Sequence, residues 1–345
     1  MTASAAQTRS LLTVLILSIL AVSLSAKPKT AIRVIQTSSA GTTVSVIDPA
    51  ANKVVGVVHD IEVNRASSAS LDGSRLFVTG QFESELAVVD AKTFHVLKRV
   101  PLDGHPDYIS TSKDGRQLYI ALDTPGAVEV LDTTTFERIK SIPIKGAVHY
   151  AYVTPDGAHV VAASVAGKIF TVIDAHTLEP EWSMTFEGGV RPIAFETGAN
   201  GATTRLFVEL SDFHGFAVVD FGTHKEVTRI TLPDVPGKIK NLDGIQGAPA
   251  HGLQITPDGR LLWATSKWYG YAFAYSLPDL KLVGQVEVGL GPEWMSITPD
   301  GKRMYVSLAG DDAVAVVDVK TMKVITRIPV GYVPKANVIA TLQAE

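Results

Sequence analysis

Residues 112–122 read SKDGRQLYIAL, and this stretch contains the two features that decide the fold. The Asp114-Gly115 pair is a tight-turn sequence, because glycine supplies the positive φ that a hairpin turn requires. The apolar run after the turn has the length and the residue types of a β-strand. The stretch therefore predicts a strand that leaves a tight turn and enters a buried sheet.

The same pattern recurs with a period of 42 residues. Asp-Gly pairs with this spacing begin at Asp72, Asp114 and Asp156 and, after an interruption, at Asp258 and Asp300. A second column of residues follows short apolar runs and comprises Asp48, Asp90, Asp132, Asp174, Asp220, Ser276 and Asp318. Strand-like repeats of this length are typical of β-propellers rather than helical solenoids. We therefore predict an all-β, seven-bladed β-propeller of four-stranded blades.

One repeat, residues 106–144, shows how a blade is built. Its expected strands are 106–112, 117–122, 127–131 and 136–144, and the Asp that follows the third strand is expected to hydrogen-bond the backbone of its turn. Large residues at one position of the second strand, such as Tyr119 and Trp263, are expected to pack between neighbouring blades.

The two ends of the repeat pattern are complementary. Residues 32–36, 43–47 and 53–58 match the second, third and fourth strands of a blade, and residues 335–341 match a first strand. The C-terminal strand is thus expected to complete the first blade in a three-plus-one closure, which removes two exposed sheet edges.

Composition narrows the class of protein. The 345 residues carry a net charge of −4, so there is no overall basic field for nucleic acid. The absence of cysteine excludes disulfides, thiolate metal sites and a thiol nucleophile. Residues 1–26 have the basic start, the short apolar run and the small residues of a secretory signal, which leaves 27–345 as one propeller in the periplasm or outside the cell. An uncleaved membrane anchor is the alternative.

Several motifs resemble a known family. Leu118-Tyr119-Ile120-Ala121 and Met304-Tyr305-Val306-Ser307 follow Asp-Gly turns, and Thr-Pro-Asp-Gly occurs at 154–157, 256–259 and 298–301. These residues resemble the YVTN-repeat (YncE-like) seven-bladed β-propellers, although the Asn that ends the family motif is missing. The resemblance implies an exported propeller and says little about activity, since its relatives include both binding proteins and enzymes.

One further column points to function. The residues seven positions before each Asp-Gly aspartate, extended by the same period, are Arg65, Asp107, His149, Arg191, His251, Glu293 and Lys335. Each begins an expected innermost strand, so the seven are predicted to ring one mouth of the central channel. Repeat positions that pack in the core are mostly occupied by apolar residues, so a position with an ionisable residue in all seven repeats favours a ligand site. The alternative is a solvated channel wall in which opposite charges pair.

Other segments are expected on the same face. The Gly- and Pro-rich insertion 233–250 leads into His251 and is predicted to form a flap over the mouth. Trp268 and Tyr269 are candidate stacking residues or ordinary loop anchors, and Trp294 lies beside Glu293. A metal site is less favoured; its candidate ligands are His214 and His251, and no cofactor is predicted.

These features predict an exported, monomeric binding or scaffold protein. Arg65, Arg191 and Lys335 would hold an anionic or polar ligand or an envelope protein partner, and the two histidines of the ring would make binding depend on pH. The alternative is a periplasmic hydrolase or lyase that uses a metal or a histidine base at the same mouth. For that enzyme the candidate bases are His149, His251 and Glu293.

Overall fold

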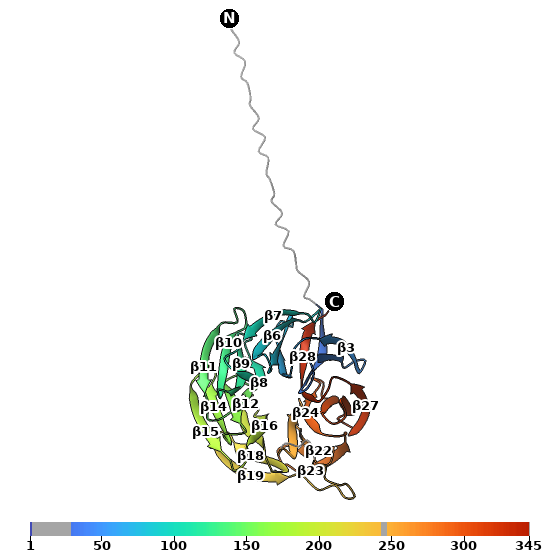
Figure 1. The fold of residues 1–345 in the computed structure, drawn as a ribbon. Helices are drawn as coiled ribbons and strands as arrows, with labels where there is room; N and C mark the ends of the chain where they lie inside the picture. The colour runs from blue at the N-terminus through green and yellow to red at the C-terminus, as the bar shows by residue number, and fades with distance from the viewer. Residues whose placement is uncertain (2–28, 243–246, 345) are drawn as a thin grey trace.

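Seven four-stranded antiparallel sheets stand around a central axis (Figure 1). The computed structural model describes residues 1, 29–242 and 247–344. The all-β, seven-bladed propeller predicted from the 42-residue period is confirmed. The expected signal, 1–26, lies outside the described residues apart from Met1.

In six blades the strands follow chain order from the channel outward, and in the first blade the C-terminal β28 lies innermost, before β1, β2 and β3 (Figure 1). The first blade contains β28 (Pro334–Gln343), β1 (Thr30–Ser38), β2 (Val44–Asp48) and β3 (Lys53–Val58). The second contains β4 (Asn64–Ala69), β5 (Arg75–Gly80), β6 (Glu85–Asp90) and β7 (Val96–Pro101). The third contains β8 (His105–Thr111), β9 (Gln117–Thr124), β10 (Ala127–Asp132) and β11 (Arg138–Pro143). The fourth contains β12 (Val148–Val153), β13 (His159–Ser164), β14 (Ile169–Asp174) and β15 (Pro180–Thr185). The fifth is β16 (Val190–Thr197), β17 (Thr203–Leu210), β18 (Gly215–Asp220), β19 (Lys225–Thr231). The sixth contains β20 (Ala250–Ile255), β21 (Leu261–Ser266), β22 (Tyr271–Ser276) and β23 (Leu282–Glu287). The seventh contains β24 (Pro292–Ile297), β25 (Arg303–Leu308), β26 (Ala313–Asp318) and β27 (Lys323–Pro329).

The ring closes where the C-terminal strand joins the first blade. β28 pairs antiparallel with β1 from Thr30 opposite Gln343 to Ser38 opposite Pro334. The amide of Gln343 also donates to the carbonyl of Gly73 in the next blade, at 2.8 Å. The predicted three-plus-one closure is therefore confirmed, with a strand that is slightly longer than 335–341.

The aspartate columns shape the turns, as expected. Oδ1 of Asp114 accepts hydrogen bonds from the hydroxyl of Ser112 and the amide of Arg116, and Gly115 has a φ of 75°. Oδ1 of Asp132 accepts from the amides of Thr134 and Thr135 at 2.7 and 2.8 Å. These carboxylates are therefore occupied by local backbone and serve the hairpins.

The fourth strand of the template blade begins later than predicted. It starts at Arg138 rather than at Phe136, because Phe136 has a φ of 61° and still belongs to the turn. The apolar character of Phe136 had suggested a strand residue, whereas its side chain packs in the hydrophobic core against Phe77 of the neighbouring blade.

Large apolar side chains of the second strands join the blades. Trp263 of β21 is fully buried in one cluster with Met295 and Ile297 of β24. Tyr305 of β25 lies with Val34 and Ile47 of the first blade and donates to Asn52 at 2.9 Å. The predicted packing between blades is thus confirmed, and it leaves the innermost strands to line the channel.

Within the described part of the chain, there is no helix with the length and apolarity that a membrane span requires.

Candidate functional site

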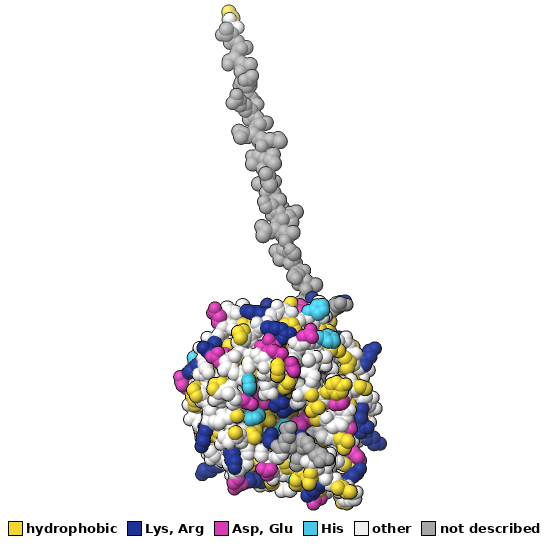
Figure 2. Space-filling model, in the orientation of Figure 1, with side chains coloured by type: hydrophobic (Ala, Val, Ile, Leu, Met, Phe, Trp, Pro, Cys, Tyr) yellow, Lys and Arg dark blue, Asp and Glu magenta, His cyan; other side chains and the backbone are white. Residues whose placement is uncertain are grey.

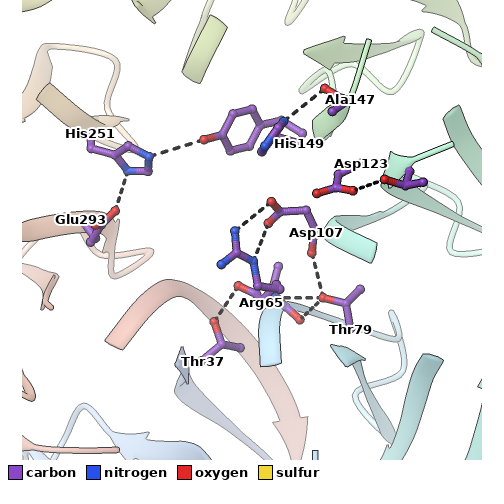
Figure 3. Close-up of polar contacts among 12 residues, drawn as sticks. Thr37, Arg65, Thr79, Asp107, Asp123, Ala147, His149, His251 and Glu293 are labelled. Atoms are coloured by element: carbon purple, nitrogen blue, oxygen red, sulfur yellow. Dashed lines mark hydrogen bonds and ion pairs between the residues drawn. The ribbon is translucent and has the colours of Figure 1, made fainter. Parts of the chain in front are cut away.

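The innermost strands bring the predicted ionisable column to one mouth of the channel. Arg65, Asp107, His149, Arg191, His251, Glu293 and Lys335 lie near the starts of β4, β8, β12, β16, β20, β24 and β28. Figure 3 shows five of them arranged around the axis, with the Arg65 and Asp107 pair and the His251 and Glu293 pair on different sides. In Figure 2 basic, acidic and histidine side chains gather at the hollow centre of the same view.

A cavity of about 420 Å³ opens at this mouth. Its charged lining residues, among those the structure describes, are Arg65, Lys267, Glu293 and Lys335. Asn241, which belongs to the insertion, also lines it. The lining holds three cations and one carboxylate, and Asp107 pairs with Arg65 behind it, so one cation is left in excess over the two carboxylates. The cavity therefore suits an anionic group or an oxygen atom that gains negative charge.

Arg65 and Asp107 form a two-pronged ion pair between neighbouring blades. Nε and Nη2 of Arg65 donate to the two carboxylate oxygens of Asp107 at 3.2 and 3.0 Å. Burial opposes ionisation of Asp107, but Arg65 and Lys335 outweigh it and lower its pKa to about 2. The pair is therefore ionised at neutral pH and fixes the position of the guanidinium.

His251, Glu293 and Lys267 form a second charged cluster. Nδ1 of His251 lies 2.8 Å from Oε2 of Glu293, and Nζ of Lys267 donates to Oε1 at 2.6 Å. Burial lowers the pKa of His251 to about 4, although Glu293 acts to raise it. Burial disfavours the Glu293 carboxylate, but His251 and Lys267 hold its pKa well below the ordinary value. At neutral pH the cluster thus contains a neutral imidazole whose Nδ1–H faces a carboxylate.

Lys335 completes the cationic side of the cavity. Its ammonium lies 5.6 Å from the ring centroid of Trp294. Burial and the charge of Arg65 lower its pKa to about 8, while Asp107 and Glu293 act to raise it. Lys335 is therefore a cation at neutral pH that loses its proton under mildly alkaline conditions.

Tyr150 follows His149 on β12, and its hydroxyl lies 3.5 Å from Nε2 of His251. Its ring is nearly parallel to that of Tyr152, with centroids 5.7 Å apart, and lies 5.8 Å from Trp294. Tyr108 packs against Tyr152 at 4.7 Å. These four rings occupy the channel below the charged residues.

The other ring members are held by the protein. Nδ1 of His149 donates to the carbonyl of Ala147 at 3.2 Å, and Nε of Arg191 donates to the hydroxyl of Ser211 at 2.9 Å. Neither side chain lines the cavity at the mouth. The structure thus brings Arg65, Glu293 and Lys335 to the cavity, with Asp107 and His251 directly behind them.

Trp268 and Tyr269 lie under the insertion and away from the cavity. The hydroxyl of Tyr269 donates to Asp234 at 2.5 Å, and the ammonium of Lys240 lies 4.2 Å from the Trp268 ring centroid. His214 packs against Trp268 with the rings tilted and their centroids 4.5 Å apart. These contacts match the loop-anchor alternative for the two aromatic residues.

The candidate metal ligands are likewise engaged elsewhere. Nε2 of His214 lies 2.7 Å from the hydroxyl of Ser266, whereas His251 contacts Glu293. In residues 29–242 and 247–344, no group of three or more His, Asp or Glu side chains has an arrangement suited to a metal ion.

Sequence reasoning missed Glu209, a fully buried carboxyl group on β17. Its two oxygens have no partner at hydrogen-bond geometry in the described structure, although the amide of Gly252 is near enough to favour the ionised form. Burial and the charge of Glu293 raise its pKa well above the ordinary value, which favours the protonated form. The only sign of it in the sequence is an acidic residue within a strand, at a position where the second strands of other blades have Thr79, Ala121 and Ala163.

Lys267 and Tyr150 were also missed as site residues. Tyr150 belongs to a column of residues one position after the ionisable ring, which also includes Tyr108 and Trp294. Lys267 lies in the loop directly after β21, and its sequence gives no sign that it turns toward the channel.

Comparison with known proteins gives a family and a fold. The family model described as "Lactonase, 7-bladed beta-propeller" matches residues 69–329, which is more than half of the chain. No curated protein sequence matches the chain.

Many solved structures share the architecture. The periplasmic gluconolactonase of Pseudomonas aeruginosa has a TM-score of 0.71 and 19% identity, over 90% of this chain and 99% of that one. A protein from Lactobacillus plantarum has a TM-score of 0.73 and 16% identity, over 90% and 100% of the two chains. The hydrazine synthase of Kuenenia stuttgartiensis has a TM-score of 0.68 and 20% identity, over 82% and 94%. At these identities the likeness shows the propeller fold alone.

Proposed function

The chain belongs to the family of seven-bladed β-propeller lactonases, and from this premise we propose that it hydrolyses a lactone at the channel mouth. The observation that carries the proposal is the buried His251–Glu293–Lys267 cluster beside a cavity with three cations. The match to the family model therefore favours the alternative predicted from the sequence, an enzyme, over a binding or scaffold protein.

In this reaction His251 acts as the general base. The Glu293 carboxylate lies 2.8 Å from Nδ1 of the neutral imidazole and favours the tautomer that carries its proton there, so Nε2 keeps its lone pair on the side of Tyr150. A water molecule gives a proton to Nε2 while its oxygen attacks the lactone carbonyl carbon. When the ring C–O bond breaks, His251 returns the proton to the leaving oxygen, and a hydroxy acid is formed.

The cations stabilise the negative charge that develops on the carbonyl oxygen. Lys267, which is buried, and Lys335, which is half-buried, line the cavity next to Glu293 and are preorganised there. Arg65 is fixed by Asp107 and lies on another side of the same cavity, where it can bind an anionic substituent of the substrate.

The substrate class that fits is a sugar-acid lactone, preferably with a carboxylate or phosphate group. Its hydroxyl groups would meet polar lining residues such as Ser39, Gln81 and Asn241, and its anionic group would meet Arg65. The gluconolactonase activity named for the Pseudomonas aeruginosa neighbour is of this class and supports the choice of the first substrate.

The direct test is an assay of the purified protein with gluconolactone and with its 6-phosphate, corrected for spontaneous hydrolysis. We expect enzymatic ring opening of both, with the larger kcat/KM for the phosphorylated lactone. Binding of the hydroxy-acid product without any acceleration of ring opening would instead support the ligand-binding function first predicted from the sequence.

The pH dependence of kcat/KM should be bell-shaped. His251 must be neutral, so activity is expected to rise as pH increases through about 4. Lys335 must be protonated, so activity is expected to fall as pH increases through about 8. A Lys335→Arg variant keeps its charge above that range and should lose the alkaline decrease. Persistence of the same alkaline decrease in this variant would assign it to another group.

Three finer predictions remain part of the proposal. The Tyr-Ile-Ala and Tyr-Val-Ser motifs support a place among YVTN-repeat relatives within the lactonase family. The pattern of residues 1–26 supports export to the periplasm or beyond, and the insertion 233–250, through Asn241, supports a flap beside the mouth.

A further inference from the structure

A side cavity of about 380 Å³ adjoins the mouth of the channel. Its lining residues, among those that the structure describes, are Val63, Gln81, Phe82, His105 and Asp123. Val63 and Gln81 line the cavity at the mouth as well, so the two spaces are neighbours. In Figure 3, Asp123 and Asp107 lie on the same side of the channel, and both belong to the third blade. The side cavity therefore extends the candidate site from the second blade toward the third.

The turn after β5 holds the ring of Phe82 at the side cavity. The amide of Gln81 donates to the carbonyl of Val63 at 3.2 Å, and the amide of Ser84 donates to the carbonyl of Gln81 at 3.3 Å. The carbonyl of Ser84 in turn accepts a hydrogen bond from the amide of Leu102 at 2.9 Å. The backbone of the turn is thus fixed on both sides of Phe82, whereas 69% of the Phe82 surface is exposed. A ligand in the cavity that covers this ring gains hydrophobic free energy.

Polar groups of the same lining are suited to bind hydroxyl groups. In the described structure the carboxylate of Asp123 accepts one hydrogen bond, from the hydroxyl of Thr124 at 2.9 Å. A carboxylate can accept about four hydrogen bonds, so Asp123 keeps capacity for a ligand. Gln81 adds an amide group and His105 adds an imidazole. An aromatic ring next to a carboxylate and an amide suits a sugar, whose C–H face packs on the ring while its hydroxyl groups donate to the oxygen atoms.

The side cavity differs from the mouth in charge. Among its described lining residues there is one carboxylate, that of Asp123, and no lysine or arginine, whereas Arg65, Lys267 and Lys335 line the mouth. Glu83, in the turn after β5, adds an exposed carboxylate nearby. These two negative charges disfavour an anionic group in the side cavity, so the unit that fits there is neutral.

We propose that the side cavity binds a neutral sugar unit that is joined to the lactone, so that the substrate is the lactone of a disaccharide acid. The inference rests on the proposed lactone hydrolysis and names its substrate class more closely. The lactone ring would lie in the mouth, and the second sugar would pack on Phe82 and donate hydrogen bonds to Asp123. The two cavities, of about 420 and 380 Å³, both have volumes that are common for small-molecule sites, so each has space for one sugar unit.

Calorimetric titration of the full protein with gluconate and with cellobionate tests the side cavity without any reaction. The two sugar acids carry the same carboxylate, and cellobionate has an additional neutral glucose unit. We expect cellobionate to bind at least about tenfold more tightly, because the additional unit packs on Phe82 and donates to Asp123. If cellobionate binds no more tightly than gluconate, or if neither sugar acid binds, the proposal is wrong.

The variant Phe82→Ala identifies the place of the additional sugar. It should weaken cellobionate binding by roughly tenfold and gluconate binding much less, and its thermal stability should not fall, because the ring is exposed. Tyr332→Ala is the matched control, since Tyr332 is also 69% exposed, on the loop before β28, but lines neither cavity. Equal effects of the two variants on cellobionate binding would contradict the assignment of the sugar to the side cavity.

Kinetics with gluconolactone and cellobionolactone separate this inference from the proposed activity. If both are right, cellobionolactone has the larger kcat/KM, mainly through a lower KM, and Phe82→Ala removes most of the difference. Ring opening of gluconolactone without tighter binding of cellobionate would support the activity and overturn the role of the side cavity. Tighter binding of cellobionate that depends on Phe82, without any acceleration of ring opening, would support the side cavity and overturn the activity.

Discussion

Replacement of His251 by asparagine is expected to lower kcat for lactone hydrolysis by about 10²–10⁴-fold, the usual contribution of a general base. The loss should fall on kcat more than on KM, because the cations that bind the substrate remain in place. Stopped-assay kinetics with gluconolactone measure both constants. Glu293→Gln should have an effect in the same direction, since it removes the carboxylate that holds Nδ1–H of His251.

His149→Asn is the matched control, because His149 belongs to the same ring but donates to the carbonyl of Ala147, whereas His251 contacts the Glu293 carboxylate. Its kcat should remain within about a factor of ten of the wild-type value, a loss below the range expected for a general base. If the two histidine variants lose activity equally, or if only His149→Asn loses it, the assignment of the base is wrong. Circular dichroism of each variant verifies that the propeller is folded.

Replacement of Asp107 by asparagine is expected to lower the free energy of unfolding by about 3–5 kcal/mol. The physical reason is that Arg65 remains buried without its carboxylate partner, while Lys335 and Arg65 still repel each other. Urea unfolding followed by far-ultraviolet circular dichroism measures the difference. The double variant Arg65→Met/Asp107→Leu removes both charges and should recover much of the loss. A double variant that is less stable than Asp107→Asn would contradict this account.

The same carboxylate predicts how stability depends on pH. The pKa of Asp107 is about 2 in the folded protein and 3.8 in its ordinary state, so folding favours the ionised form. Its contribution to stability is therefore fully present above about pH 4 and is lost as pH falls toward about 2. Wild-type protein and Asp107→Asn should differ less in stability at the acidic end of this range.

The fold was predictable because the signals for it are local and repeated. Each Asp-Gly turn fixes a hairpin, and the constant distance to Asp132 and its equivalents fixes the register of the third strand. Phe136 was misplaced because apolar character alone does not reveal a positive φ. The closure by β28 was accessible from the phase of the repeat at its two ends.

The position of the site was partly predictable, whereas its internal pairing was not. The period placed Arg65 and Asp107 on neighbouring blades, but only the structure shows that they bind each other rather than leave both charges for a ligand. Lys267 reaches Glu293 from a loop, and the sequence of a loop does not specify the direction of a side chain. Trp268 and Tyr269 are likewise turned under the insertion by Lys240 and Asp234, which are distant from them in sequence.

The strand that closes the ring also carries Lys335 of the mouth. During synthesis, every other innermost strand leaves the ribosome before Lys335 does. The cavity at the mouth is not complete until β28 docks on β1, so we expect intermediates with an open ring to lack the proposed activity. Brief separation of β28 from β1 in the folded protein should likewise disrupt the mouth, and hydrogen exchange of the amides of β28 reports how often this seam opens.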